Sequence, residues 1–247
     1  TSSDGMLLTP FGVIDDAIQA VAPLPADSGT VIRIVGNGGL DGDVSTTDDN
    51  LPYQLGVDNS NMILEDGRQL EVPQGVMVMI DAGAVFKLHK SRIGVGSSSS
   101  IVDRSRGALQ VLGTSGNQVI FTSWLDESIG TDTSLGTPTS PDTGNWGGLV
   151  FRNDTDRAQN HFNYQTEGIF LNYVAHSDIR YGGGKVIVDT ALQTVSPIHI
   201  TQDQPTIVHN RITMNEDSAM SADPDSFEEL TFNTPRFQEG LAAFTSD

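Results

Sequence analysis

The most informative segment of the chain reads Val72-Pro-Gln-Gly-Val-Met-Val-Met-Ile80-Asp-Ala-Gly-Ala-Val-Phe-Lys-Leu88, two short apolar runs joined by an Asp-Ala-Gly turn. The pattern returns in Gly107-Ala-Leu-Gln-Val-Leu-Gly113-Thr-Ser-Gly-Asn-Gln-Val119-Ile-Phe-Thr-Ser123 and in Gly144-Asn-Trp-Gly-Gly-Leu-Val-Phe-Arg-Asn153. Short strands that recur along the chain and are separated by glycine-rich turns are typical of a solenoid, in which the chain coils and its turns stack. The runs are nearly continuous in apolar residues, as strands of parallel sheets are. The sequence therefore predicts an all-β fold, a right-handed parallel β-helix, with a β-sandwich as the alternative.

Three regions are expected along the chain. Residues 1–29 form a helical flank or cap, because the apolar residues over 13–21 have helical spacing and Pro23 follows them. Residues 30–217 hold the β-helix strands. Residues 218–247 are an acidic segment that docks on the stack or leads to the next module. Polar segments predict long loops on one face of the stack, at 91–106, 126–144 and 154–167.

Composition restricts the partners and the location. The 247 residues contain 13 Lys+Arg against 32 Asp+Glu, a formal net charge of −19, and no cysteine. Such a surface repels nucleic acid and attracts divalent cations. The absence of thiols and disulfides fits an exported bacterial protein, and no apolar run is long enough for membrane insertion. We therefore expect an extracellular or cell-surface setting.

The loop after the first expected strand is the best metal candidate. Oxygen ligands for Ca²⁺ could come from Asn37, Asp41, Asp43, Ser45 and Asp48. Their spacing approaches the twelve-residue calcium loop, although the last ligand is an aspartate where that loop has a bidentate glutamate. The alternative is an acidic turn at a solvated edge. Calcium is the one cofactor that the sequence suggests.

Residues for catalysis are harder to find, and the sequence favours a protein without enzymatic activity. A polysaccharide lyase site could be built from Asp178, Arg180 and Lys185 with bound calcium, but an ion pair on the strand surface explains these residues as well. The aromatic side chains of Trp146, Tyr173 and Tyr181 could stack on a sugar if they point outward. The five histidines are not spaced as metal ligands.

Several phrases resemble a β-helix segment found in very large exported proteins of planctomycete-type bacteria. They are Val31-Ile-Arg-Ile-Val-Gly-Asn-Gly-Gly39, Asp49-Asn-Leu-Pro-Tyr-Gln-Leu-Gly56, the 72–87 segment, Ala108-Leu-Gln-Val-Leu-Gly113 and Asp178-Ile-Arg-Tyr-Gly-Gly183. The resemblance covers most of residues 30–226. More broadly, the pattern is similar to the right-handed parallel β-helix superfamily that includes pectate lyases and many adhesins. The resemblance implies a right-handed β-helix in an extracellular setting and carries no activity with it.

The combined interpretation is a structural or adhesive surface module, a stiff rod that presents loops and is stabilised by calcium. Its expected partners are other modules of the same protein, copies of itself, or a glycan. The alternative is a carbohydrate-active enzyme, a polysaccharide lyase or glycoside hydrolase, that uses a groove along the β-helix. A third class, a calcium-dependent partner-binding module, differs from the scaffold only in having a ligand.

Overall fold

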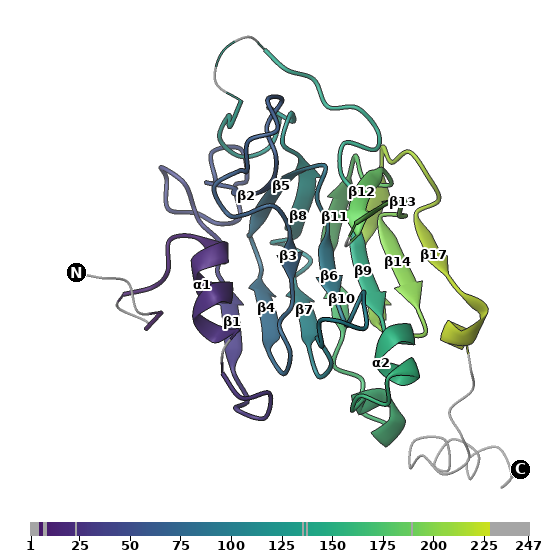
Figure 1. Ribbon diagram of the computed structural model, residues 1–247. Coiled ribbons are helices and arrows are strands. Elements are labelled where there is room, and N and C mark those ends of the chain that lie inside the picture. Colours follow the sequence, from purple (N-terminus) through teal and green to yellow (C-terminus); the bar gives the residue numbers. More distant parts are fainter. Residues whose placement is uncertain are drawn as a thin grey trace, which may run out of the picture.

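Three parallel sheets of five strands each form the body of the molecule (Figure 1). The computed structural model describes residues 5–6, 9–22, 24–134, 136, 138–188 and 190–227. The first sheet contains β1 (Val31–Ile34), β4 (Met77–Asp81), β7 (Ala108–Leu112), β10 (Tyr173–Ala175) and β15 (Thr206–Val208). The second contains β2 (Tyr53–Gly56), β5 (Val85–His89), β8 (Val119–Ser123), β11 (Ser177–Arg180) and β16 (Arg211–Thr213). The third contains β3 (Leu70–Glu71), β6 (Ile93–Val95), β9 (Leu149–Arg152), β14 (Ile198–Thr201) and β17 (Met220–Ala222).

Successive passes of the chain supply neighbouring strands of each sheet. Each pass visits the first, second and third sheets in that order, and all pairings within these sheets are parallel. The register is regular, so that Met77 lies opposite both Val31 and Ala108. The sheets are open, with β1, β2 and β3 at one edge and β15, β16 and β17 at the other. The all-β parallel architecture expected from the sequence is confirmed.

The core is built by side chains that alternate along the strands. In β4, Val78 and Ile80 are fully buried while Met77, Met79 and Asp81 are partly exposed. A column of four aromatic rings crosses three passes: Tyr53 to Phe86 and Phe86 to Phe121 are each 5.2 Å apart between ring centroids, and Phe121 to Trp146 is 6.3 Å. Aromatic pairs at these separations add attraction beyond the burial of their area.

Single residues make some of the corners. His176 alone separates β10 from β11, with a φ of 48°, and His209 occupies the next pass with a φ of 56°. The two imidazole rings stack at 4.8 Å. Asn210 fastens this corner to the preceding pass, because its Oδ1 accepts hydrogen bonds from the N and Oγ of Ser177 at 2.9 and 2.8 Å. Positive φ is uncommon outside glycine, so stacking and these bonds offset a strained backbone.

A helix and a hairpin accompany the sheets. The helix predicted over 13–21 is confirmed as α1 (Ile14–Val21), which lies beside β1 (Figure 1) and buries Ile14 and Ala17 in the main core. The antiparallel hairpin of β12 (Lys185–Val188) and β13 (Ala191–Thr194) forms a separate sheet between β11 and β14. It supplies Val186 and Val188 to a second small core that also contains Val150 and Val195.

The expected loops need correction. The 91–106 segment is not all loop, because it contains β6, whose Ile93 and Val95 are buried. Nor do the three loops share one face: the 96–107 and 153–172 connections lead from the third sheet to the first, whereas 126–144 leads from the second to the third. The third sheet also continues through β17, beyond the boundary expected at residue 217. Residues 228–247 of the expected acidic segment lie outside the described residues.

Candidate functional site

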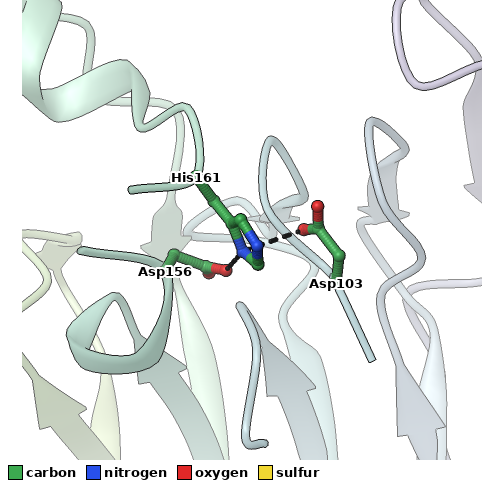
Figure 2. A group of neighbouring side chains, drawn as sticks. All are labelled: Asp103, Asp156 and His161. Carbon is green, nitrogen blue, oxygen red and sulfur yellow. Dashed lines mark hydrogen bonds and ion pairs between the residues drawn. The ribbon is translucent and has the colours of Figure 1, made fainter. Parts of the chain in front are cut away.

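Two connections that lead from the third sheet to the first form what we call the third-to-first corner. They are residues 96–107, after β6, and residues 153–172, which carry α2 (Asp154–Ala158) and the short 3-10 helix η1 (Tyr164–Glu167). Three chemically active side chains meet there, from Asp103, Asp156 and His161 (Figure 2). Among the described residues, this trio is the one group of acidic, histidine or cysteine side chains whose ligand atoms all lie within 4.8 Å of one another.

The imidazole of His161 lies between two carboxylates. Its Nδ1 is 3.0 Å from Oδ1 of Asp156 and 3.4 Å from Oδ1 of Asp103. The Asp156 side chain is 2% exposed, while those of His161 and Asp103 are 24% and 35% exposed. Asp156 therefore forms the buried side of the trio, while His161 and Asp103 are open to solvent.

Hydrogen bonds from the chain fix both carboxylates. Asp156 accepts from the N of Ser97 at 3.0 Å and from its Oγ at 2.5 Å, which compensates the burial of its charge. Asp103 accepts from the N of Ser105 at 2.8 Å and from Nε2 of Gln74 at 2.6 Å. These bonds to other residues hold both carboxylates in place beside His161, as in a preorganised site.

The trio can act in two ways. With His161 protonated, it is an ion-paired latch that holds the 153–172 connection against the 96–107 connection. With His161 neutral, the same three atoms form an N, O, O ligand set for a divalent cation. Ligand atoms around a tetrahedral Zn²⁺ at about 2.1 Å are roughly 3.4 Å apart, close to the separations found here.

The spacing of the five histidines along the sequence did not indicate metal ligands, so His161 was not among the candidate site residues. The local signal is the pair Asp156 and His161, five positions apart in sequence. Asp103 comes from the preceding pass of the chain, so only the three-dimensional arrangement of the connections brings it to the pair.

The residues predicted to bind calcium lie on the connection from β1 to β2. Asn37 and Asp41 each accept a hydrogen bond from the backbone N–H two residues further on, at 2.9 and 2.7 Å. Asp43 accepts from both the N and the Oγ of Ser45, and the hydroxyl hydrogen bond lowers the pKa of the Asp43 carboxyl. Asp48 is exposed in the same loop. Because these bonds are local turns that form with or without an ion, the calcium site stays a prediction.

Two of the residues considered for a lyase, Asp178 and Arg180, bind each other. Nη2 of Arg180 is 2.6 Å from Oδ2 of Asp178 on the same strand, and this hydrogen bond raises the pKa of the Arg180 guanidinium. A guanidinium held in its charged form cannot take a proton from a substrate. Lys185 is exposed on the β12 hairpin. The geometry is that of a partly buried ion pair.

The aromatic residues considered for sugar stacking are also dispersed. Trp146 is fully buried at the end of the ring column, and its Nε1 donates to the carbonyl of Arg180 at 2.7 Å. It therefore offers no ring face to solvent. Tyr173 lies in β10 of the first sheet, whereas Tyr181 makes the corner after β11 with a φ of 60°.

A buried carboxyl lies beneath the 153–172 connection. Asp203 is 1% exposed and accepts hydrogen bonds from Nε2 of Gln165, from Nδ2 of Asn172 at 3.0 Å and from the N of Gln204 at 2.6 Å. Burial raises the pKa of Asp203 to about 6, against the opposing effect of these donors.

Comparison of the chain with protein-family models, with curated proteins and with solved structures finds no match. Among the described residues, no helix has both the length and the apolar character to cross a membrane.

Proposed function

We propose that the chain coils as a right-handed parallel β-helix and serves as a structural or adhesive module of a large exported bacterial protein. The supporting observation is the order of the strands, since every pass adds one parallel strand to each of the three sheets. Connections between parallel strands are right-handed in about 98% of cases, which favours that hand here. The resemblance to exported proteins of planctomycete-type bacteria and the extracellular or cell-surface location belong to the same proposal.

In this proposal the stacked strands form a stiff rod, and the rod is what carries out the structural role. Each pass contacts only its neighbours, so stiffness accumulates along the stack while connections vary at the corners. Open sheet edges favour contact with other modules of the same protein or with copies of itself. A glycan is the further partner class for the exposed connections.

The carbohydrate-active enzyme remains the alternative class. It is disfavoured by the pairing of Asp178 with Arg180, which holds both residues in an ion pair and leaves only the exposed Lys185 of the residues considered for it. Incubation with acidic and neutral polysaccharides, followed by assays for new reducing ends and unsaturated uronates, tests this choice. Product release would replace the structural role with an enzymatic one.

A pair of deletions tests the coiled fold. Deletion of residues 77–107 removes β4, β5 and β6 and places β7 where β4 stood, because Met77 and Ala108 share a register position. Deletion of residues 85–107 is shorter but leaves β4 followed directly by β7, two strands of the same sheet. Both variants lose Ser97 and Asp103, so that loss is common to the pair. A coiled stack predicts cooperative unfolding for the longer deletion and loss of folding for the shorter one. The opposite ranking, read from tryptophan fluorescence in urea, would reject the coil.

Calcium stabilisation is tested by thermal unfolding in millimolar Ca²⁺ and in chelator. A ligand present at about 100 times its Kd stabilises the state that it binds by about 2.7 kcal/mol. If calcium binds the loop, the midpoint rises for the natural chain and not for Asp43→Asn. Equal midpoints in calcium and chelator would remove calcium from the proposal.

A further inference from the structure

The His161 trio needs a positively charged occupant among its three facing atoms. These atoms are Nδ1 of His161, Oδ1 of Asp156 and Oδ1 of Asp103, all within 4.8 Å of one another, and the imidazole lies between the two carboxylates (Figure 2). Each carboxylate oxygen is an acceptor, and so is an imidazole nitrogen that carries no hydrogen. Three acceptors that face one another repel, so either a proton or a metal ion lies among them.

A proton on Nδ1 serves the two carboxylates unequally. Its contact with Oδ1 of Asp156, at 3.0 Å, is a hydrogen bond. The distance from Nδ1 to Oδ1 of Asp103 is 3.4 Å, beyond the range of about 2.7–3.2 Å that N–H···O hydrogen bonds prefer. One N–H group has one direction and cannot be aligned with both oxygens. A metal ion binds all three atoms at once, and the arrangement therefore suits an ion better than a proton.

The charge of the trio matches a divalent ion. Two carboxylates and a neutral imidazole carry two negative charges, which one divalent cation cancels. A single proton leaves one negative charge in the trio. The side chain of Asp156 is only 2% exposed, and an uncompensated charge at such a position is costly. Binding of a divalent cation therefore removes the imbalance from the buried side of the trio.

Hydrogen bonds behind the carboxylates aim their oxygens at the trio. Oγ of Ser97 accepts the N–H of Arg104 at 2.7 Å, so its own hydrogen is directed to Oδ1 of Asp156. Gln74, on the connection from β3 to β4, donates from Nε2 to Oδ2 of Asp103 at 2.6 Å, which leaves Oδ1 of Asp103 facing His161. Donors in this position fix the orientation of metal ligands and are typical of metal sites.

The kinds of ligand atom select Zn²⁺ over Ca²⁺. Calcium takes six to eight oxygen ligands at about 2.3–2.6 Å, whereas zinc takes four ligands, nitrogen among them, at about 2.0–2.2 Å. The separations of 3.0 and 3.4 Å from Nδ1 to the two oxygens suit the smaller ion. The side chains of His161 and Asp103 are 24% and 35% exposed, so the ion and a water ligand enter from their side.

We propose that Asp103, Asp156 and His161 bind one Zn²⁺ ion, with water as the fourth ligand. The ion takes the place of the Nδ1 proton, which is released to solvent. It joins the 96–107 connection to the 153–172 connection and so fastens two successive passes of the chain to each other. This site goes beyond the proposed structural role and does not depend on it, because its ligands lie outside the Asn37–Asp48 loop.

Calorimetric titration of the chain with zinc chloride, near neutral pH and in excess Ca²⁺, tests the inference. We expect one Zn²⁺ per chain and a rise in the unfolding midpoint, because the ion binds only the folded state. Excess Ca²⁺ fills any calcium loop and should leave the zinc affinity unchanged. Absence of zinc binding would show that the trio is only an ion-paired latch. Suppression of zinc binding by Ca²⁺ would show general attraction to the acidic surface, and either result overturns the inference.

Two pairs of variants locate the ion. Asp103→Asn and His161→Asn each remove one ligand, and the loss of affinity should exceed the roughly 10–100-fold that a change behind the ligands costs. Asp43→Asn removes a carboxylate from the predicted calcium loop, and His209→Asn removes an imidazole from the corner between β15 and β16; both should retain the zinc affinity. Unfolding in chelator confirms that each variant is folded. Natural affinity in either site variant, or an equal loss in His209→Asn, would place the ion elsewhere and refute the site.

Discussion

The buried carboxyl of Asp203 is expected to make stability depend on pH in the direction opposite to that of an ordinary paired aspartate. Burial raises the pKa of Asp203 from 3.8 to about 6 in the folded chain. Between these values the folded state holds a proton that the unfolded state has lost. Stability is therefore higher at low pH and falls as the pH rises through about 4 to 6.

The size of the effect follows from the same shift. Each pKa unit is worth about 1.4 kcal/mol, so full ionisation of Asp203 costs about 3 kcal/mol of unfolding free energy. In Asp203→Asn the site cannot ionise, and Gln165 can turn its amide so that its carbonyl oxygen accepts from the new NH₂ group. The free energy of the natural chain minus that of Asp203→Asn should therefore drop by about 3 kcal/mol between about pH 3.5 and pH 7.

Urea unfolding followed by tryptophan fluorescence, repeated across this pH range, measures the difference. Taking the difference between two chains cancels the titration of the other carboxyls. Asp48→Asn is the matched control, because it removes the same charge from an exposed position and should give a flat difference. A flat difference for Asp203→Asn as well would show that burial does not perturb this carboxyl.

Three further predictions concern the core, the corner and a tyrosine. Phe121→Ala removes the centre of the aromatic column and should cost about 3–5 kcal/mol in urea unfolding, with Phe121→Leu much milder; equal costs would show that the ring stacking contributes little. Ser97→Ala leaves the buried Asp156 short of a donor and should cost about 1–3 kcal/mol, whereas an unchanged midpoint would mean that water replaces the hydroxyl. Burial raises the pKa of Tyr53 to about 12, so stability should fall as the pH rises from about 10 to 12. Ultraviolet titration should show a late phase that Tyr53→Phe removes; a single phase near pH 10 would contradict it.

The strands could be predicted where the apolar runs were long enough. The 72–88 and 107–123 segments correspond to β4, β5, β7 and β8, since their β-branched and apolar residues occur in runs of about five. β6 was missed because its three residues, Ile93, Gly94 and Val95, stand between polar neighbours. A strand this short owes its burial to the sheet that receives it, and its own sequence carries little of that information.

The candidate site could not be predicted for a different reason. Asp103 and His161 are far apart in sequence and meet only because two connections start from the same sheet. The burial of Asp203 likewise depends on the 153–172 connection that covers it. Local spacing describes ligands within one loop, as in the Asn37–Asp48 prediction, and says nothing about pairs formed between successive passes of the chain.

The β12–β13 hairpin has a consequence for local opening. Its described residues pair with no strand of the three main sheets, and its valines pack on Val150, which lies outside the main core cluster. Detaching the hairpin would thus uncover a few valines without breaking the strand pairing of the three main sheets. Because the hairpin already exposes Ile187 and Leu192, its opening would add Val150 to an apolar surface that is present in the closed form.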